Sequence, residues 1–249
     1  MKSAPRKLDP VVKSRLYEGI VRQIMHKIIT GEFKPGEKLP AEREIAGSLA
    51  VNRSTLREAL KKLEVLGLVD IRHGDGIYVQ NYLESGNLEL FREIIYHDEV
   101  LSQEILDNVL VIRRTLVPEM AAIAAGLRTG QHVRDLRAVI ESEDDDSMLE
   151  SDLRVHHVIA RASGNMLYIF ILNFFNQLFR DFGHIYFDFP ANRKRSAKFH
   201  RDIADAIEAG NPDKARRIMR EVLMYTEERI HEFYKSGESV GRGAAGKGA

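Results

Sequence analysis

The segment from Lys38 to Leu66 constrains the fold of this chain most, because it encodes two short helices joined by a tight turn. Pro40 suits the first turn of a helix, where a missing N–H costs nothing. Asn52 can cap the second helix, whose exposed N–H groups attract a phosphate. The apolar side chains recur at helical spacing and face one core; they are Ile45, Leu49, Leu56, Leu60 and Leu63. The segment therefore predicts a helix-turn-helix that binds DNA.

A short β-hairpin is expected directly after the second helix. Gly67 ends that helix, since glycine readily adopts the left-handed conformation found at helix C-termini. Two alternating runs, residues 68–72 and 77–80, then flank a turn that contains Gly-Asp-Gly. A helix-turn-helix followed by such a hairpin is a winged helix. His73 and Gly74, at the tip of the wing, can approach a minor groove because glycine allows the backbone to come close.

Charge is divided unevenly along the chain. Residues 1–80 contain 15 Lys and Arg against 10 Asp and Glu, whereas residues 81–249 contain 22 against 27, so the halves carry +5 and −5. A basic first part and an acidic second part are typical of a protein that contacts phosphates with one domain only. The chain contains no cysteine and no long apolar N-terminal run, so we expect a cytoplasmic protein without a membrane segment.

Four stretches of the first eighty residues carry a recognisable pattern: residues 28–40, 42–43, 55–60 and 63–68. Together they resemble the DNA-binding domain of the GntR family of bacterial transcription factors. The resemblance implies that double-stranded DNA is contacted by Arg43, Asn52, Arg53, Ser54, Thr55, Arg57, His73 and Gly74. The alternative for the two arginines at 43 and 57 is that they only pair with neighbouring glutamates.

The remainder of the chain is expected to be all helical. We therefore predict a mainly α protein: an N-terminal arm over residues 1–10, a winged helix-turn-helix with a small β-hairpin over 11–80, and a linker over 81–87. An all-α bundle of six or seven helices, for effector binding and dimerisation, follows over 88–235. The glycine-rich end, residues 236–249, is expected to be a disordered tail.

Several fragments of this second part resemble the effector-binding domain of the FadR subfamily of the GntR family. They include Arg113, Asp152-x-x-x-His156, Ala162-Ser163-Gly164-Asn165 and His200. Many members of the subfamily hold a divalent metal such as zinc or nickel with one Asp and three His. The resemblance places three of these ligands at Asp152, His156 and His200, whereas the expected fourth position is Val222.

The three polar residues allow two interpretations. Asp152 and His156 are four residues apart, so they share a helix face and could chelate one ion, with His200 completing an open site. Alternatively, Asp152 and His156 form a hydrogen bond within one helix and His200 is a satisfied core histidine. A metal-dependent hydrolase built on these residues is a third possibility, but no paired nucleophile and base accompanies them.

Residues 169–189 are unusually aromatic. They can form a central helix that is buried on most sides, or they can line an apolar tunnel. Fragments such as Leu172-Asn173 and Gly183-His184-x-Tyr186-Phe187 are similar to the branch of the subfamily that senses long-chain acyl-CoA. That similarity implies effector contacts at Arg113, Asn173, Tyr186 and Thr226.

The function expected from these features is that of a sequence-specific transcriptional regulator. A single winged helix contacts only a few base pairs, so we expect a homodimer on a palindromic operator. A small-molecule effector in the helical domain, either a carboxylate at a metal site or a long-chain acyl-CoA, would modulate DNA binding. Repression is the expected output.

Overall fold

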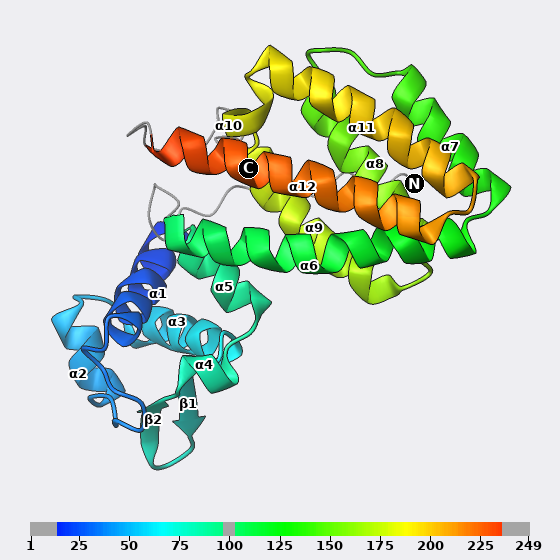
Figure 1. Cartoon of the computed structure of the whole chain (residues 1–249). Helices are drawn as coiled ribbons and strands as arrows, with labels where there is room; N and C mark the ends of the chain where they lie inside the picture. The colour runs from blue at the N-terminus through cyan, green and yellow to red at the C-terminus, as the bar shows by residue number, and fades with distance from the viewer. Residues whose placement is uncertain (1–13, 97–102, 236–249) are drawn as a thin grey trace, which may run out of the picture. The chain divides into compact units, whose positions relative to one another are not determined.

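The computed structural model describes residues 14–96 and 103–235 of the chain, and these two ranges belong to two separate compact units (Figure 1). The arm expected at residues 1–10 and the tail expected at 236–249 lie outside the described residues. Within the described residues, no helix combines the length and apolar character needed to cross a membrane.

The first unit is a winged helix. Three helices, α1 (Ser14–Ile29), α2 (Glu42–Ser48) and α3 (Arg53–Val65), precede the antiparallel strands β1 (Val69–Arg72) and β2 (Gly76–Val79). Two short helices follow, α4 (Tyr82–Ser85) and α5 (Leu88–Ile95). Their apolar faces share one core, whose most deeply buried side chains include Met25, Leu56, Leu60, Leu63, Leu66 and Leu68. The predicted helix-turn-helix and hairpin are both confirmed.

Local contacts explain both ends of α3. The Asn52 side chain accepts a hydrogen bond from the backbone N of Thr55 at 2.8 Å, which satisfies a donor that the helix cannot pair. At the other end Gly67 has φ +75°, and a Cβ there would lie 2.2 Å from the carbonyl oxygen of Ser85. Only glycine allows this close approach between the end of α3 and α4.

The first unit extends further along the chain than the linker expected at residues 81–87. Residues 82–85 are helical, and α5 packs on the winged helix through Leu90, which is buried in its core. Asn87 donates a side-chain hydrogen bond to the carbonyl of Val65 at 2.8 Å, and Glu89 forms an ion pair with Lys62. Residues 88–95, expected in the helical bundle, thus belong to the first unit.

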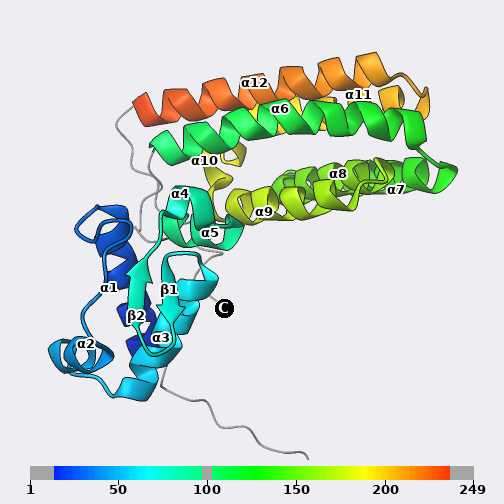
Figure 2. The same cartoon turned by 90° about the horizontal axis from the view of Figure 1, so that it is seen from below.

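The second unit contains seven helices in its described residues: α6 (Gln103–Leu127), α7 (Gly130–Glu141), α8 (Met148–Ala162), α9 (Met166–Phe182), α10 (His184–Phe187), α11 (Pro190–Glu208) and α12 (Pro212–Lys235). Helices α6, α11 and α12 form one layer, and α7, α8 and α9 form the other (Figure 2). Helix α6 runs antiparallel to α12 along most of its length (Figure 1). The all-α prediction is confirmed, although Gly183 divides the aromatic segment 169–189, considered as one central helix, into α9 and α10.

Candidate DNA interface and effector site

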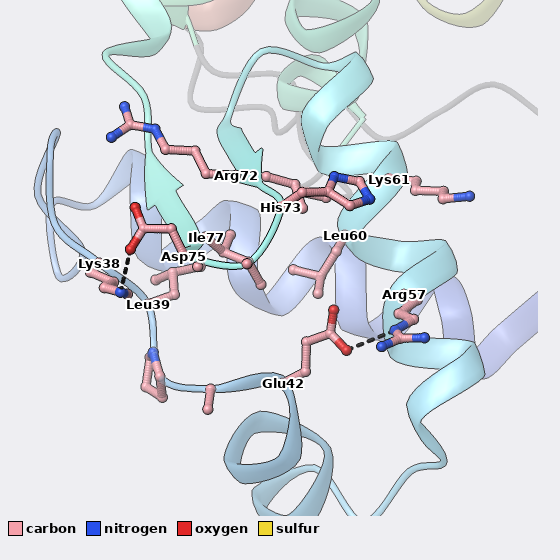
Figure 3. Close-up of a pocket in the computed structure, with 15 residues that line it drawn as sticks. Lys38, Leu39, Glu42, Arg57, Leu60, Lys61, Arg72, His73, Asp75 and Ile77 are labelled. Atoms are coloured by element: carbon pink, nitrogen blue, oxygen red, sulfur yellow. Dashed lines mark hydrogen bonds and ion pairs between the residues drawn. The ribbon is translucent and has the colours of Figure 1, made fainter.

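A groove of about 750 Å³ lies between the wing and α3 (Figure 3). The segment before α2 forms its floor, and the turn between β1 and β2 forms one wall. Its charged lining residues are Lys38, Glu42, Arg57, Lys61, Arg72 and Asp75. Cations therefore outnumber carboxylates in the groove, which suits a polyanionic ligand.

Arg57 lines this groove and forms an ion pair. Its Nε donates to Oε2 of Glu42 at 2.7 Å, so a residue of α2 holds a cation of α3 (Figure 3). The alternative considered for Arg57, pairing with a glutamate, is thus present, but the side chain remains 64% exposed. Among the described residues, Arg43 and Arg53 are exposed and have no ion-pair partner, so their charges are available to a phosphate or a base.

The polar residues at the start of α3 point toward each other. The hydroxyls of Ser54 and Thr55 donate to Oδ1 of Asn52 at 2.7 and 2.9 Å. Thr55 is only 4% exposed, so its side chain belongs to the helix cap and is not displayed to solvent. Ser54 and Asn52 are exposed at the same end of the helix.

The wing tip places His73 and Gly74 at the edge of the groove, where both residues are exposed. Gly74 has φ +77°, a conformation that favours glycine. Lys38 and Asp75, which the sequence pattern did not single out as contact residues, also line the groove. Asp75 accepts hydrogen bonds from the Lys38 ammonium and from the Tyr78 hydroxyl, both at 2.9 Å.

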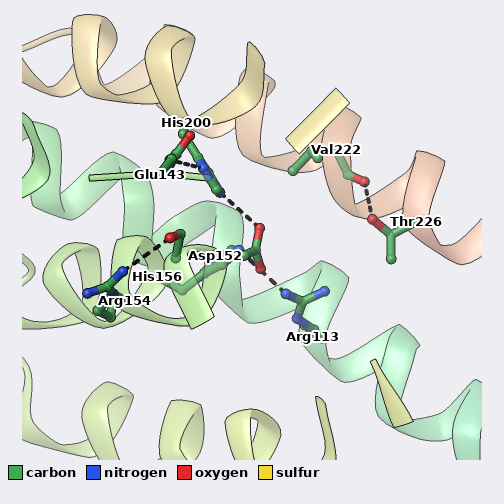
Figure 4. A network of polar contacts seen from close by, with 9 residues as sticks. Arg113, Glu143, Asp152, Arg154, His156, His200, Val222 and Thr226 are labelled. Atoms are coloured by element: carbon green, nitrogen blue, oxygen red, sulfur yellow. Dashed lines mark hydrogen bonds and ion pairs between the residues drawn. The ribbon is translucent and has the colours of Figure 1, made fainter. Parts of the chain in front are cut away.

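The second site is a buried polar network inside the helical unit. Arg113 of α6, Asp152 and His156 of α8, and His200 of α11 point toward one another (Figure 4). His200 Nε2 lies 3.1 Å from Asp152 Oδ1, and its Nδ1 contacts the carboxylate of Glu143. His156 Nε2 lies 3.5 Å from the Arg113 guanidinium and 3.6 Å from Asp152 Oδ2. Glu143 is a member that the sequence analysis missed.

Burial and neighbouring charges decide the protonation states of the two histidines. Burial disfavours a charged His200, but hydrogen bonds to Asp152 and Glu143 outweigh it and raise the pKa to about 9. Burial lowers the pKa of His156 to about 4, and the Arg113 charge acts in the same direction. At neutral pH His200 is therefore a cation and His156 is neutral.

The charges of Asp152 and Arg113 follow from the same arrangement. Burial acts to raise the pKa of Asp152, but His156, His200 and Arg113 outweigh it and bring the pKa to about 2. Since His156 is neutral at pH 7, Arg113 and His200 are the cations that stabilise this carboxylate. Burial lowers the pKa of Arg113 to about 10, so the guanidinium stays charged.

These residues do not form a ready metal site. Within residues 14–96 and 103–235, no three His, Cys, Asp or Glu are placed to hold a metal ion. Both ring nitrogens of His200 face carboxylates, and a metal ligand must instead offer a neutral nitrogen lone pair. Arg113 brings a positive charge to His156, and Val222 lines the same cavity in place of a fourth donor. His200 is thus a satisfied core histidine, as the second interpretation expected, whereas Asp152 and His156 lie 3.6 Å apart and form no hydrogen bond with each other.

Two small cavities lie side by side at this network. An apolar cavity of about 30 Å³ is lined by Leu106, Val109, Leu178, Phe179, Phe182, Gly183, Ile185, Tyr186 and Ile230. A polar cavity of about 10 Å³ is lined by residues that include Arg113, Asp152, His156, Val222 and Thr226. Phe179 and Tyr186 line both cavities, so the two are neighbours.

Only some of the expected effector residues line the two cavities. Arg113, Tyr186 and Thr226 line the polar cavity, whereas Asn173 is exposed on α9 and lines neither cavity. Three buried atoms beside the polar cavity have no hydrogen-bond partner of ordinary geometry: Arg113 Nε, His156 Nδ1 and the Tyr186 hydroxyl. Such atoms are rare in folded proteins, so a polar group that enters this cavity would find partners.

The comparisons with known proteins match both parts of the chain. Residues 16–79 match the gntR family of bacterial regulatory proteins, and residues 108–224 match the FCD domain. A fatty acid metabolism regulator protein of Klebsiella pneumoniae is 30% identical over 228 residues, which cover 91% of this chain and 95% of that protein. The chain belongs to the GntR family.

Two further comparisons extend this likeness. The transcriptional regulator Mce2R of Mycobacterium tuberculosis is 28% identical over 87% of this chain and 92% of its own length. The solved structure of Lar from Listeria monocytogenes shares 17% identity and a TM-score of 0.51 over 91% of this chain and 99% of that one, which shows the common fold.

As a GntR-family protein with an FCD domain, the chain is a DNA-binding transcriptional regulator and not an enzyme. The hydrolase considered from Asp152, His156 and His200 has no support. The groove belongs to the DNA-binding domain of the family, and the buried network belongs to its effector-binding FCD domain.

Proposed function

We propose that this regulator is cytoplasmic, binds a palindromic operator as a homodimer and represses transcription until a long-chain acyl thioester, such as an acyl-CoA, enters the FCD domain. The observation that carries the effector proposal is the junction of the two cavities. An apolar cavity suits an acyl chain, and the adjoining polar cavity offers Arg113 and the Tyr186 hydroxyl to a carbonyl oxygen. The names of the fatty acid metabolism regulators among its relatives point in the same direction.

On the DNA side, we propose that Arg43, Arg53, Ser54 and Arg57 contact the operator, with His73 and Gly74 at its minor groove. Asn52 caps α3, and Thr55 supports that cap from a buried position. The exposed cations at the start of α3 and the open groove beside the wing support this placement.

Effector entry requires the helices to separate. A cavity of about 30 Å³ has room for only one or two waters, so an acyl chain cannot fit without movement of α6, α9 or α12. An effector that binds such an open state tenfold more tightly shifts the equilibrium by about 1.4 kcal/mol. This differential binding is the proposed link between effector and operator affinity.

A small carboxylate is the second candidate. The buried guanidinium of Arg113 is a partner that a carboxylate prefers, and its Nε has no hydrogen-bond partner. In this alternative the anion binds Arg113 without a metal, because the donor set around His200 is already satisfied. A metal such as zinc or nickel at Nε2 would have to replace the proton shared with Asp152, whereas Glu143 could keep its contact with Nδ1.

The test uses the purified full-length protein and an operator selected from random duplexes. Operator affinity is measured while a long-chain acyl-CoA, free CoA or the free fatty acid is added, and the metal content is measured on the same sample. We expect the acyl-CoA alone to release the protein from the operator. We also expect the released protein to contain no stoichiometric metal. Release by short carboxylates only would support the second candidate, and a palindromic selected site with a dimeric mass would support the homodimer.

A matched pair of variants tests whether the effector binds in the apolar cavity. Val109→Phe fills the apolar cavity, whereas Val111→Phe adds the same bulk to an exposed position of the same helix. The first variant should lose the response to acyl-CoA while it still binds the operator, and the second should keep both. An unaltered response in a folded Val109→Phe protein would contradict the proposed cavity.

A further inference from the structure

An acidic side chain lies at the DNA-facing tip of the wing, where a polyanion would repel it. Asp75, in the turn between β1 and β2, accepts a hydrogen bond from Lys38 Nζ through Oδ1 and one from the Tyr78 hydroxyl through Oδ2. Both distances are 2.9 Å. We name Lys38, Asp75 and Tyr78 the wing latch.

The wing latch connects two segments that are distant in the sequence. Lys38 precedes α2 and forms a β-bridge with Tyr78 of β2, and the N–H of Leu39 donates to the carbonyl of Ile77 at 2.8 Å. The Lys38 side chain crosses the backbone of Gly76 so closely that a Cβ there would lie 2.4 Å from its Cε. The latch therefore ties the wing tip to the floor of the groove (Figure 3).

The aromatic ring of the latch is also held in place. The Arg72 guanidinium lies 4.2 Å from the centroid of the Tyr78 ring, and the Lys38 ammonium lies 5.5 Å from it. Asp70 in turn pairs with Arg72 at 2.8 Å. The wing is thus ordered by side-chain contacts in addition to its short strand pair, and the backbone of His73 and Gly74 is positioned by them.

The charge of Asp75 has a consequence for DNA binding. Lys38 bound to Asp75 contributes no net charge to the groove, whereas a free ammonium would attract any phosphate regardless of sequence. Sequence-independent attraction raises operator and non-operator affinity together, while a well-placed wing favours only the operator. A carboxylate at this position therefore lowers the affinity for every duplex through its charge, and it raises the ratio of operator to non-operator affinity by placing the wing.

We propose that Asp75 is a positioning residue for DNA recognition: through Lys38 and Tyr78 it orients the wing and withholds one cation from non-specific phosphate binding. This inference rests on the proposed placement of the wing against DNA. The wing latch thus acts on the ratio of operator to non-operator affinity through the wing, and on the affinity for every duplex through its charge.

Two variants of the full-length protein separate the two effects. Asp75→Asn removes the charge and weakens the bond to Lys38, whereas Tyr78→Phe removes one hydrogen bond and leaves every charge in place. Affinities for the selected operator and for an unrelated duplex are measured over a range of salt concentrations. Glu84→Gln, in α4 and outside the groove, is the control with the same change of charge.

With Asp75→Asn we expect stronger binding to the unrelated duplex, with a salt dependence steeper by about one phosphate contact. The ratio of operator to non-operator affinity should fall about two- to fivefold, the range of an exposed hydrogen-bonded ion pair. Tyr78→Phe should lower the same ratio without a change in the salt dependence. Glu84→Gln should leave the ratio unchanged.

An unchanged affinity ratio in Asp75→Asn would overturn the proposal, because the residue would then act only through net charge. An unchanged ratio in Tyr78→Phe would overturn the positioning part alone. The His73→Ala and Arg57→Ala proteins test the proposed DNA placement separately. If both bind the operator as tightly as the parent protein, that placement is wrong. All three latch residues are at least partly exposed, so these variants retain the core.

Discussion

Glu42, the first residue of α2, accepts a 2.7 Å hydrogen bond from Nε of Arg57 in the middle of α3. The two side chains are 30% and 64% exposed, and an ion pair of this kind contributes at most about 1 kcal/mol to stability. Its larger effect is on orientation, because it holds the guanidinium at the groove where the operator is proposed to bind.

Arg57→Ala should therefore weaken operator binding far more than it weakens folding. We expect a loss of about 1–3 kcal/mol in operator affinity, as for an arginine at a base edge, and a nearly unchanged melting temperature. Fluorescence anisotropy and thermal unfolding measure the two quantities. Arg22→Ala, an exposed arginine of α1 outside the groove, is the control, and equal losses in both variants would contradict the interface.

Gly67 and Gly47 form a second matched pair, this time for stability. Gly67→Ala forces a side chain into a left-handed conformation and toward the Ser85 carbonyl, so it should destabilise the protein by at least about 1–3 kcal/mol. Gly47 lies within α2 with open space at its Cβ position, and Gly47→Ala should stabilise by about 0.5–1 kcal/mol. Urea unfolding of the full-length proteins tests both signs; equal effects would contradict the tight contact between α3 and α4.

The buried network predicts that stability declines at alkaline pH. The pKa of His200 is raised to about 9 in the folded protein, above about 6.5 in an unfolded chain. Its contribution is therefore complete below about pH 6.5 and is lost as the pH rises toward 9. The groups that face this ring are Glu143, from the segment between α7 and α8, and Asp152 of α8.

The pKa of His156 gives the opposite dependence of stability on pH. Its folded pKa is lowered to about 4, so its contribution is complete above about pH 6.5 and is lost as the pH falls toward 4. Together the two histidines place the maximum of stability near pH 6.5, about the ordinary histidine value.

Unfolding free energies from urea titrations between weakly acidic and alkaline pH measure this dependence. Asp152→Asn should flatten the alkaline decline and lower the stability by about 3–5 kcal/mol, because it leaves a buried charge without its partner. If that variant does not fold, an NMR titration of the His200 ring in the parent protein gives the midpoint directly. A midpoint near the ordinary value of about 6.5 would contradict the network.

Local patterns along the chain were sufficient to predict the winged helix. The cap at Asn52, the left-handed Gly67 and the alternating strands act over a few residues each, so their signals are present in sequence and agree with the structure. The same holds for the helical nature of the second unit, since apolar spacing and glycine breaks are also local.

Contacts between distant residues were not predictable in this way. Arg57 and Glu42 come from different helices, Lys38 and Asp75 lie 37 positions apart, and Glu143 reaches His200 across 57. Leu90, expected in the helical bundle, instead packs into the winged-helix core.

The sequence by itself determined the two domain types, the cap and turns of the DNA-binding unit, and the candidates for DNA and effector contacts. Only the tertiary structure decided that Thr55 faces inward and that Asp75 holds Lys38. It likewise decided that the cations Arg113 and His200 meet the carboxylates Asp152 and Glu143 where a metal was considered. Helix caps and periodicity depend on neighbours in the chain, whereas burial and ion pairing depend on which distant groups the fold brings within about 4 Å.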